Sequence, residues 1–326
     1  MRSNRYVAGV DGGASKTVAL VGTESGDILG RGESGSSNYH NIGSVAASEA
    51  IENAVNAAKE HAGLRRVKLE TTVVALAGID SSKDSKAATR FVRGARLAKK
   101  SFVIHDSVAA LYTATRGRPG IVVNSGTGCF AAGTSATRKY VRVGGWGNLI
   151  DDRGSGFDIG MKAILMAFRM MDGRTQRTRL VSLVKRGLRV KMFDEILDLI
   201  YVKKIGVYGI ARLVPMISRA ASRDKVCRDI LKEAGLTLAE LVCTAARELR
   251  LTGEQFTLYT TGGVFGSGPY LLKPFISKIK KHCPRSRIVG LEIEPVKGSF
   301  WLAGELSRHG FRGEHRDWVT LPTEIR

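Results

Sequence analysis

A glycine-rich segment near the start of the chain, Gly9 to Thr17, constrains the fold more than any other stretch. It lies between two apolar runs, Tyr6 to Val10 and Val18 to Val21, each as long as a short strand. A polar turn at residues 24–27 then leads to a third run, Ile28 to Gly30. The segment is therefore predicted to form the bend of a β-hairpin and not the start of a helix.

The hairpin context excludes two common phosphate-binding motifs. A Walker A loop needs a glycine directly before Lys-Thr and a helix after it, but Ser15 occupies that position and a strand follows. The dinucleotide fingerprint also needs a helix, and its glycine spacing is absent. Asp11, at the end of the first strand, is a carboxylate that could hold a hydrated Mg²⁺. Backbone and side-chain donors for an anion follow it: Gly12, Gly13, Ser15, Lys16 and Thr17. An ordinary hairpin turn is an equal alternative on these residues alone.

Length and cysteine usage indicate a globular protein of two domains. The chain has 326 residues, of which 43% are hydrophobic. No apolar run approaches the roughly 18 residues of a membrane span, and the first residues lack a signal-peptide core. The four cysteines are scattered, without CxxC spacing, which argues against a zinc site, an iron–sulfur site or a disulfide framework. We expect a cytoplasmic protein.

The formal net charge of +21 raises the question of a nucleic-acid partner. The lysines and arginines are spread over most of the chain, on the expected solvent faces of amphipathic helices, and no aromatic-interleaved basic strand accompanies them. We therefore expect a solvated basic surface and no nucleic-acid site. Such a surface would still attract anionic nucleotides.

A second glycine-rich bend, within Ile121 to Gly133, repeats the first pattern of strand, polar turn and strand. Asn124 stands where Asp11 stood in the first. Two such hairpins, separated by a domain's length of chain, suggest a duplicated unit whose hairpins hold phosphates from two sides.

Asp106 lies between an expected strand, residues 101–105, and an expected helix, residues 107–115. Aspartate is a preferred N-cap, and the residues alone favour this structural role for Asp106. A carboxylate at the carboxyl end of a strand is also where a general base would be placed. One residue can do both.

Two further loops have the composition of ligand-binding segments. Residues 34–43 are rich in hydroxyls and amides, although a plain polar connector has the same composition. Residues 144–157 combine many glycines with a tryptophan and two aspartates, which favours a substrate loop over core packing. The remaining expected elements are helices at 44–62, 83–100 and 297–308, strands at 71–77, 256–260 and 288–293, and an all-helical stretch at 175–251 interrupted near its middle by Gly235.

These segments in this order resemble the sugar kinase, Hsp70 and actin ATPase superfamily, and more closely the BadF/BadG/BcrA/BcrD ATPase family, which includes the N-acetylglucosamine kinases. The likeness covers essentially the whole chain. It is carried by six motifs, at residues 9–17, 37–41, 105–110, 124–128, 144–156 and 261–264. The resemblance implies an α/β fold of two ribonuclease H-like domains flanking an ATP cleft. The domains would be residues 1–116 and 117–326, with a helical insertion at 175–251 in the second and a C-terminal helix at about 297–309 packed back onto the first.

The resemblance also implies a role for each matching residue. The first phosphate loop would be Gly12, Gly13, Ser15, Lys16 and Thr17, the second Ser125, Gly126, Thr127 and Gly128, and the adenosine turn Gly262 and Gly263. Asp11 would hold Mg²⁺ through water, and Asp106 would be the general base. Asn38, Gly145, Trp146 and Asp152, with Asp106, would contact a hexosamine. The implied protein is a homodimeric ATP- and Mg²⁺-dependent kinase that converts N-acetylglucosamine to its 6-phosphate. Such chemistry needs in-line positioning, charge neutralisation and a carboxylate at the acceptor oxygen.

Two departures from the family pattern leave the sugar open among N-acetylglucosamine, glucosamine, N-acetylmannosamine and glucose. Members commonly read Gly-Asp-Glu-Gly-Ser where this chain has Asp151 to Ser155, so Arg153 reverses a charge beside the expected sugar loop. Ala14 stands where a glycine is usual. The alternatives are a non-kinase ATPase of the dehydratase-activator type, which needs cluster-ligating cysteines not recognised here, and an ATP-switched regulatory protein, which needs neither sugar loop nor base.

Overall fold

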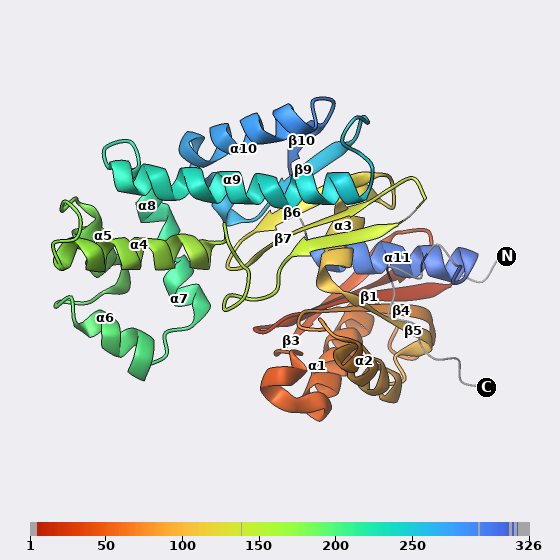
Figure 1. Ribbon diagram of the computed structural model, residues 1–326. Helices are drawn as coiled ribbons and strands as arrows, with labels where there is room; N and C mark the ends of the chain where they lie inside the picture. Colours follow the sequence, from red (N-terminus) through yellow and green to blue (C-terminus); the bar gives the residue numbers. More distant parts are fainter. Residues whose placement is uncertain (1–4, 138, 293, 313–314, 316–317, 319–326) are drawn as a thin grey trace. The chain divides into compact units, whose positions relative to one another are not determined.

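The computed structural model describes residues 5–137, 139–292, 294–312, 315 and 318, which form two compact units (Figure 1). Within these residues, the first unit contains the chain up to Pro119, Thr134–Tyr140 and the chain from Glu294 onward. The second contains Gly120–Gly133 and Val141–Glu292. Each unit is built on its own five-stranded sheet.

The sheet of the first unit has the strand order β3-β2-β1-β4-β5. Its strands are β1 (Tyr6–Gly12), β2 (Thr17–Thr23), β3 (Ile28–Ser34), β4 (Leu69–Leu76) and β5 (Ala98–His105). The first three are antiparallel, whereas β1, β4 and β5 run parallel. The glycine-rich segment is the turn between β1 and β2, where the Gly13 N–H donates to the Lys16 carbonyl at 3.0 Å. The predicted hairpin is therefore confirmed.

Helices cover both faces of this sheet (Figure 1). The helices α1 (Tyr39–His61) and α2 (Ser82–Gly94) pack on one face in a core that includes Ala8 and Val10. The helices α3 (Asp106–Thr115) and α11 (Pro295–His309) pack on the other, in a core that includes Val7. Because side chains alternate along a strand, Asp11 belongs to the α3 and α11 face.

One expected boundary in the first unit is wrong. The helix expected over 83–100 ends at Gly94, because residues from Ala98 onward extend β5 and pair with β4. The helix expected from Ser44 follows a kink at Gly43, whose conformation is non-helical (φ 80°, ψ 162°), and a short helical piece from Tyr39 precedes that kink within α1.

The sheet of the second unit, in the order β10-β9-β6-β7-β8, repeats the order of the first. Its strands are β6 (Gly120–Ser125), β7 (Cys129–Thr134), β8 (Tyr140–Gly144), β9 (Thr257–Thr261) and β10 (Arg287–Gly290). As in the first sheet, the strand that enters the glycine-rich turn pairs in parallel with the fourth strand, since Asn124 lies opposite Thr261. The strand expected over 288–293 ends at Gly290, and Ile293 lies outside the described residues.

The stretch expected to be all helical contains helices and turns but no strand, and the structure describes every residue of 175–251. The helices from the glycine-rich loop onward are α4 (Gly156–Met171), α5 (Leu180–Leu188), α6 (Glu195–Leu197), a π-helical turn η1 (Asp198–Val202), α7 (Val207–Ala211), α8 (Val214–Ala220) and α9 (Lys225–Glu248). A 3₁₀ turn, η2 (Gly263–Ser267), and α10 (Pro269–His282) follow β9. They share one hydrophobic core with β6, in which Cys227 is fully buried. None of the described helices is long and apolar enough to cross a membrane.

Gly235 does not interrupt the long amphipathic stretch, because α9 continues through it. Its role is steric: a Cβ at this position would lie 2.3 Å from the Leu271 carbonyl oxygen of α10. The absence of a side chain lets the two helices approach closely.

We expect Gly235→Ala to lower the free energy of unfolding by about 1–3 kcal/mol, because the added methyl must push α10 away from α9. This loss opposes the gain of about 1 kcal/mol that alanine brings to a helix interior. Urea unfolding would measure it, with Gly253→Ala as the control, since a Cβ there meets nothing within 4 Å. Equal stabilities of the two variants would show that the close approach is not needed.

Candidate active site

Three parallel strands of the first unit end side by side. The register places Gly12 of β1 opposite Leu76 of β4, and Leu76 opposite His105 of β5. Asp11 is one residue before the end of β1, and Asp106 directly follows β5 as the first residue of α3. The carboxyl edge of a parallel sheet is where open α/β folds bind ligands, so this edge is the candidate site.

The Asp106 carboxylate acts on the ionisation of Asp11 at this edge. Burial, and then the Asp106 carboxylate, raise the pKa of Asp11 from 3.8 to about 6, and Lys16 opposes the rise. Two neighbouring carboxylates destabilise each other's charged forms unless a cation lies near them. The two carboxylates therefore suit a hard cation bound at Asp11.

Asp106 is not the N-cap of α3, which corrects the interpretation favoured by the residues alone. The cap is His105, whose Nδ1 accepts the Ser107 N–H at 3.1 Å. Oδ1 of Asp106 is buried, lies 2.7 Å from His105 Nδ1 and accepts no hydrogen bond from the described residues. Capping does not engage this carboxylate and its side chain is 34% exposed, so a ligand can reach it.

The structure adds a chain of polar side chains around His105 that sequence reasoning missed. His105 Nε2 lies 3.3 Å from Asp80 Oδ1, and Ser107 Oγ lies 2.5 Å from His105 Nδ1 and 2.7 Å from the Tyr140 hydroxyl. The position of His105 beside Asp106 was the available signal, whereas nothing in the sequence indicated Tyr140.

The first glycine-rich turn packs against the loop that follows β3. The Gly13 carbonyl accepts the Ser37 N–H at 3.2 Å, and a Cβ at Gly12 would lie 2.2 Å from Ser37 Oγ. Thr17 is fully buried, and its hydroxyl donates to the Gly35 carbonyl at 2.7 Å, so it is engaged within the protein. The donors still exposed to a ligand are the Ser15 and Lys16 side chains.

Asn38 lies beside the same sheet edge. Its Oδ1 accepts the His40 N–H at 3.1 Å, which makes it the N-cap of α1. His40 Nε2 in turn lies 2.9 Å from the carbonyl oxygen of Gly78, just beyond β4. Asn38, which is predicted to contact the sugar, therefore also has a structural role at the end of β4.

In the second unit, the structure brings three predicted loops into contact. Gly126 N–H donates to the Gly128 carbonyl at 2.9 Å and closes the turn after β6. Ser125 Oγ donates to the Gly154 carbonyl at 2.9 Å, which ties this turn to the glycine-rich loop. Gly262 has a φ of 97°, and a Cβ there would lie 2.3 Å from the Ser125 carbonyl oxygen. Only glycine permits that approach. Gly263 starts η2, and the Thr127 carbonyl accepts the Phe157 N–H at 3.2 Å.

The residues predicted to contact the sugar in the second unit lie in different surroundings. Asp152 Oδ1 accepts the Cys129 N–H at 3.4 Å, and the carboxylate lies against Gly128, so it borders the second glycine-rich turn. Gly145 has a φ of 76°. Trp146 is 51% exposed, with the Arg142 guanidinium 4.6 Å from its ring centroid. The Arg153 side chain points to solvent.

In the part of the chain that the structure describes, no three His, Cys, Asp or Glu side chains gather into a metal cluster. Mg²⁺ in phosphoryl-transfer sites needs only one or two carboxylates, with waters and phosphates completing its shell. The single carboxylate of Asp11 fits that kind of binding.

The two repeated sheets and the ligand-binding edge define the class of protein: a two-domain ATPase of the sugar kinase and actin type. Within that class, the BadF/BadG/BcrA/BcrD ATPase family matches residues 8–303, and the chain belongs to this family. The resemblance found in the motifs is thereby confirmed.

The similarity to known proteins covers nearly the whole chain. The chain is 28% identical to the N-acetylmuramic acid/N-acetylglucosamine kinase of Clostridium acetobutylicum, over 92% of this chain and 98% of that one. It is also 28% identical to the N-acetyl-D-glucosamine kinase of Dictyostelium discoideum, with the same coverage. A solved structure from Chromobacterium violaceum, described as a candidate N-acetylglucosamine kinase, matches with a TM-score of 0.74 at 23% identity, over 92% of this chain and 99% of that one. The last likeness supports the fold.

Proposed function

We propose that the protein is an ATP-dependent hexosamine kinase that transfers the γ-phosphate to the 6-hydroxyl of N-acetylglucosamine. The observation that carries this proposal is the Asp106 carboxylate, which lies partly exposed at the carboxyl edge of the sheet next to Asp11 and is not used as a helix cap. A switch or binding protein needs no carboxylate in that state. The kinases among the relatives support the same choice.

In the proposed reaction, Asp106 accepts the proton of the sugar hydroxyl as the hydroxyl attacks the γ-phosphorus. Its side chain is partly exposed, and the cap made by His105 holds its backbone in place at the start of α3. Asp11 would hold Mg²⁺ through water, and the ion would supply positive charge to the phosphates.

The glycine-rich turns supply backbone donors to the phosphates in this proposal. The first uses Gly12, Gly13, Ser15 and Lys16, and the second uses Ser125 to Gly128. The turn at Gly262 and Gly263 receives the adenosine. The sugar is bound by Asn38, Gly145, Trp146 and Asp152. Replacing the exposed Arg153 should change which sugar is preferred. We also propose a homodimer that acts in the cytoplasm.

The test is ADP release with Mg·ATP and a panel of hexoses, hexosamines and N-acetylhexosamines. We expect turnover that depends on the sugar and is fastest with an N-acetylhexosamine, because a kinase site positions only the correct hydroxyl in line with the phosphate. Slow ADP release that is the same with and without every sugar would contradict the proposal and favour a non-kinase ATPase.

A further inference from the structure

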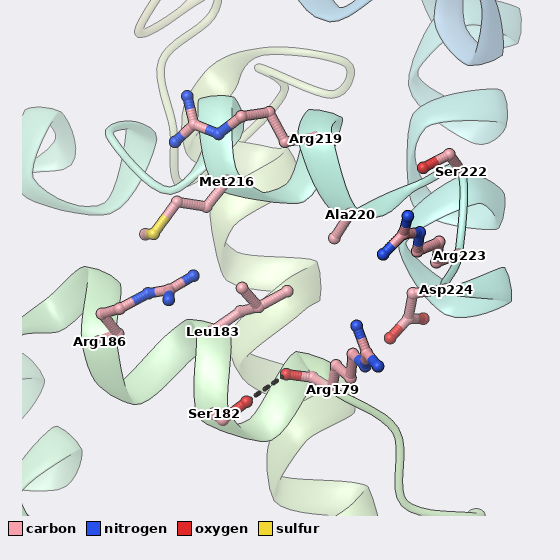
Figure 2. Close-up of a pocket in the computed structure, with 10 residues that line it drawn as sticks. All are labelled: Arg179, Ser182, Leu183, Arg186, Met216, Arg219, Ala220, Ser222, Arg223 and Asp224. Atoms are coloured by element: carbon pink, nitrogen blue, oxygen red, sulfur yellow. Dashed lines mark hydrogen bonds between the residues drawn. The ribbon is translucent and has the colours of Figure 1, made fainter.

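The helical part of the second unit contains a cavity of about 540 Å³ that shares no residue with the candidate active site (Figure 2). It lies between α5, α8 and the turn that joins α8 to α9. Its volume is in the range of about 300–1,000 Å³ that is typical of small-molecule sites. The residues that define its chemistry are Arg179, Arg186, Arg219, Arg223, Ser182 and Asp224.

The lining is strongly basic, with four arginines and one aspartate. Among the described residues, none of the four guanidinium groups has a carboxylate oxygen within the 4.0 Å of an ion pair, whereas Arg31 and Arg174 have such partners. All four arginine side chains are exposed, so an anion can reach them, and an anion bound between them would relieve their mutual repulsion, most strongly at low salt. Arginine is also the side chain whose planar donors best match phosphate oxygens.

Asp224 gives the cavity a second chemical requirement. The residue is only 4% exposed, and its Oδ1 caps α9 by accepting the N–H groups of Val226 and Cys227 at 2.9 and 3.2 Å. Its Oδ2 is buried, and no N–H or O–H group of the described residues donates to it. Its neighbour is the Cys227 thiol, whose pKa burial and Asp224 together raise to about 12, so the thiol remains a weak donor.

A buried carboxylate oxygen that lacks a strong donor destabilises the structure unless a ligand supplies one. Figure 2 shows Asp224 among the residues that line the cavity, together with Arg179 and Arg223. The cavity therefore offers positive charge for an anion and an acceptor for a hydroxyl or amino group.

We propose that this cavity binds a phosphorylated small molecule that also carries a hydroxyl or amino group, such as a sugar phosphate. The arginines bind the phosphate, and Asp224 Oδ2 accepts a hydrogen bond from the hydroxyl or amino group. The site does not depend on the kinase reaction, because none of its residues belongs to the proposed catalytic machinery. It also gives part of the excess positive charge of the chain a defined partner.

Calorimetric titration of the full chain at low salt would test the site with four probes. Glucose 6-phosphate carries both groups, inorganic phosphate carries only the anion, glucose carries only the hydroxyls, and AMP places the phosphate on a nucleoside. We expect glucose 6-phosphate to bind more tightly than inorganic phosphate and its affinity to fall as NaCl is raised. If AMP binds more tightly at this site, the phosphate source is a nucleotide and the sugar-phosphate assignment is overturned.

The double variant Arg179→Gln/Arg223→Gln assigns the binding event to this cavity. We expect it to weaken that event about tenfold or more, since each hydrogen bond between charged groups contributes roughly a factor of ten. The matched control is Arg66→Gln/Arg212→Gln, which removes the same charge at two exposed positions away from the cavity lining. A probe that binds at the catalytic site would have the same affinity for both double variants. Equal affinities in the two doubles for every probe would therefore overturn the proposal.

Asp224→Asn tests whether the ligand needs the charged acceptor of Asp224. The asparagine side chain still offers an acceptor for the helix cap. We expect the preference for glucose 6-phosphate over inorganic phosphate to fall severalfold, because the charged acceptor for the hydroxyl is lost. Thermal unfolding of the variant would establish that it folds. An unchanged preference in the folded variant would exclude Asp224 from the site and contradict the proposed ligand class.

Discussion

Asp106→Asn is expected to lower sugar-dependent ADP release by about 10²- to 10⁴-fold, the range that a general base contributes. The asparagine side chain keeps the shape of the carboxylate but cannot accept the proton of the hydroxyl. The N-cap of α3 should survive, because His105 makes it. ATP binding should stay within about threefold of wild type, since Asp106 belongs to the proton-transfer step.

The matched control is Asp229→Asn, which removes an exposed aspartate that pairs with Lys225 one helical turn away. Such a surface pair contributes little to stability, so activity should remain near wild type. Rates of ADP release with N-acetylglucosamine, measured beside equilibrium ATP binding, separate the two effects. Activity of Asp106→Asn within tenfold of wild type would show that the base is another group.

Asp11→Asn is expected to change both activity and the pH dependence of stability. In wild type the pKa of Asp11 rises from 3.8 to about 6 on folding, so the folded state retains a proton that the unfolded state has released. This stabilising contribution is complete below pH 3.8 and is lost as the pH rises through about 6. A shift of this size corresponds to about 2–3 kcal/mol.

The variant carries no titrating group at this position, so its stability should fall less than that of wild type between pH 4 and 7. Chemical unfolding at several pH values would measure the difference, with Asp229→Asn following wild type. Mg²⁺ should stabilise wild type above pH 6, where Asp11 is ionised, and should have a smaller effect on the variant. Parallel pH curves for wild type and Asp11→Asn would contradict the raised pKa. Equal Mg²⁺ effects would contradict the proposed metal site.

The same variant should lose most kinase activity at neutral pH, although it is expected to be more stable there. The reason is that the close placement of two carboxylates disfavours the folded state but suits cation binding. Higher stability together with lower activity distinguishes a functional carboxylate from one that serves only the fold.

Alternation and glycine spacing were enough to predict both hairpins, because a strand–turn–strand signal lies within a few residues. The motifs then indicated the family and, through it, the α/β fold of two domains. The boundary at Gly94 could not be predicted in the same way, since basic residues occur equally in a helix and in an edge strand. Only pairing with β4 decides that residues 98–100 are strand.

The sequence by itself determined the two repeated hairpins, the family and the residues that the motifs mark. Tertiary structure decided how these residues are used. It gave the cap of α3 to His105 and left the Asp106 side chain partly exposed, and it placed Asp11 where burial and a second carboxylate raise its pKa. It also gathered four arginines, from two separate segments of the chain, around one cavity. The physical reason is that burial, charge coupling and close backbone approach depend on distances between elements that are remote in sequence, and no local pattern encodes those distances.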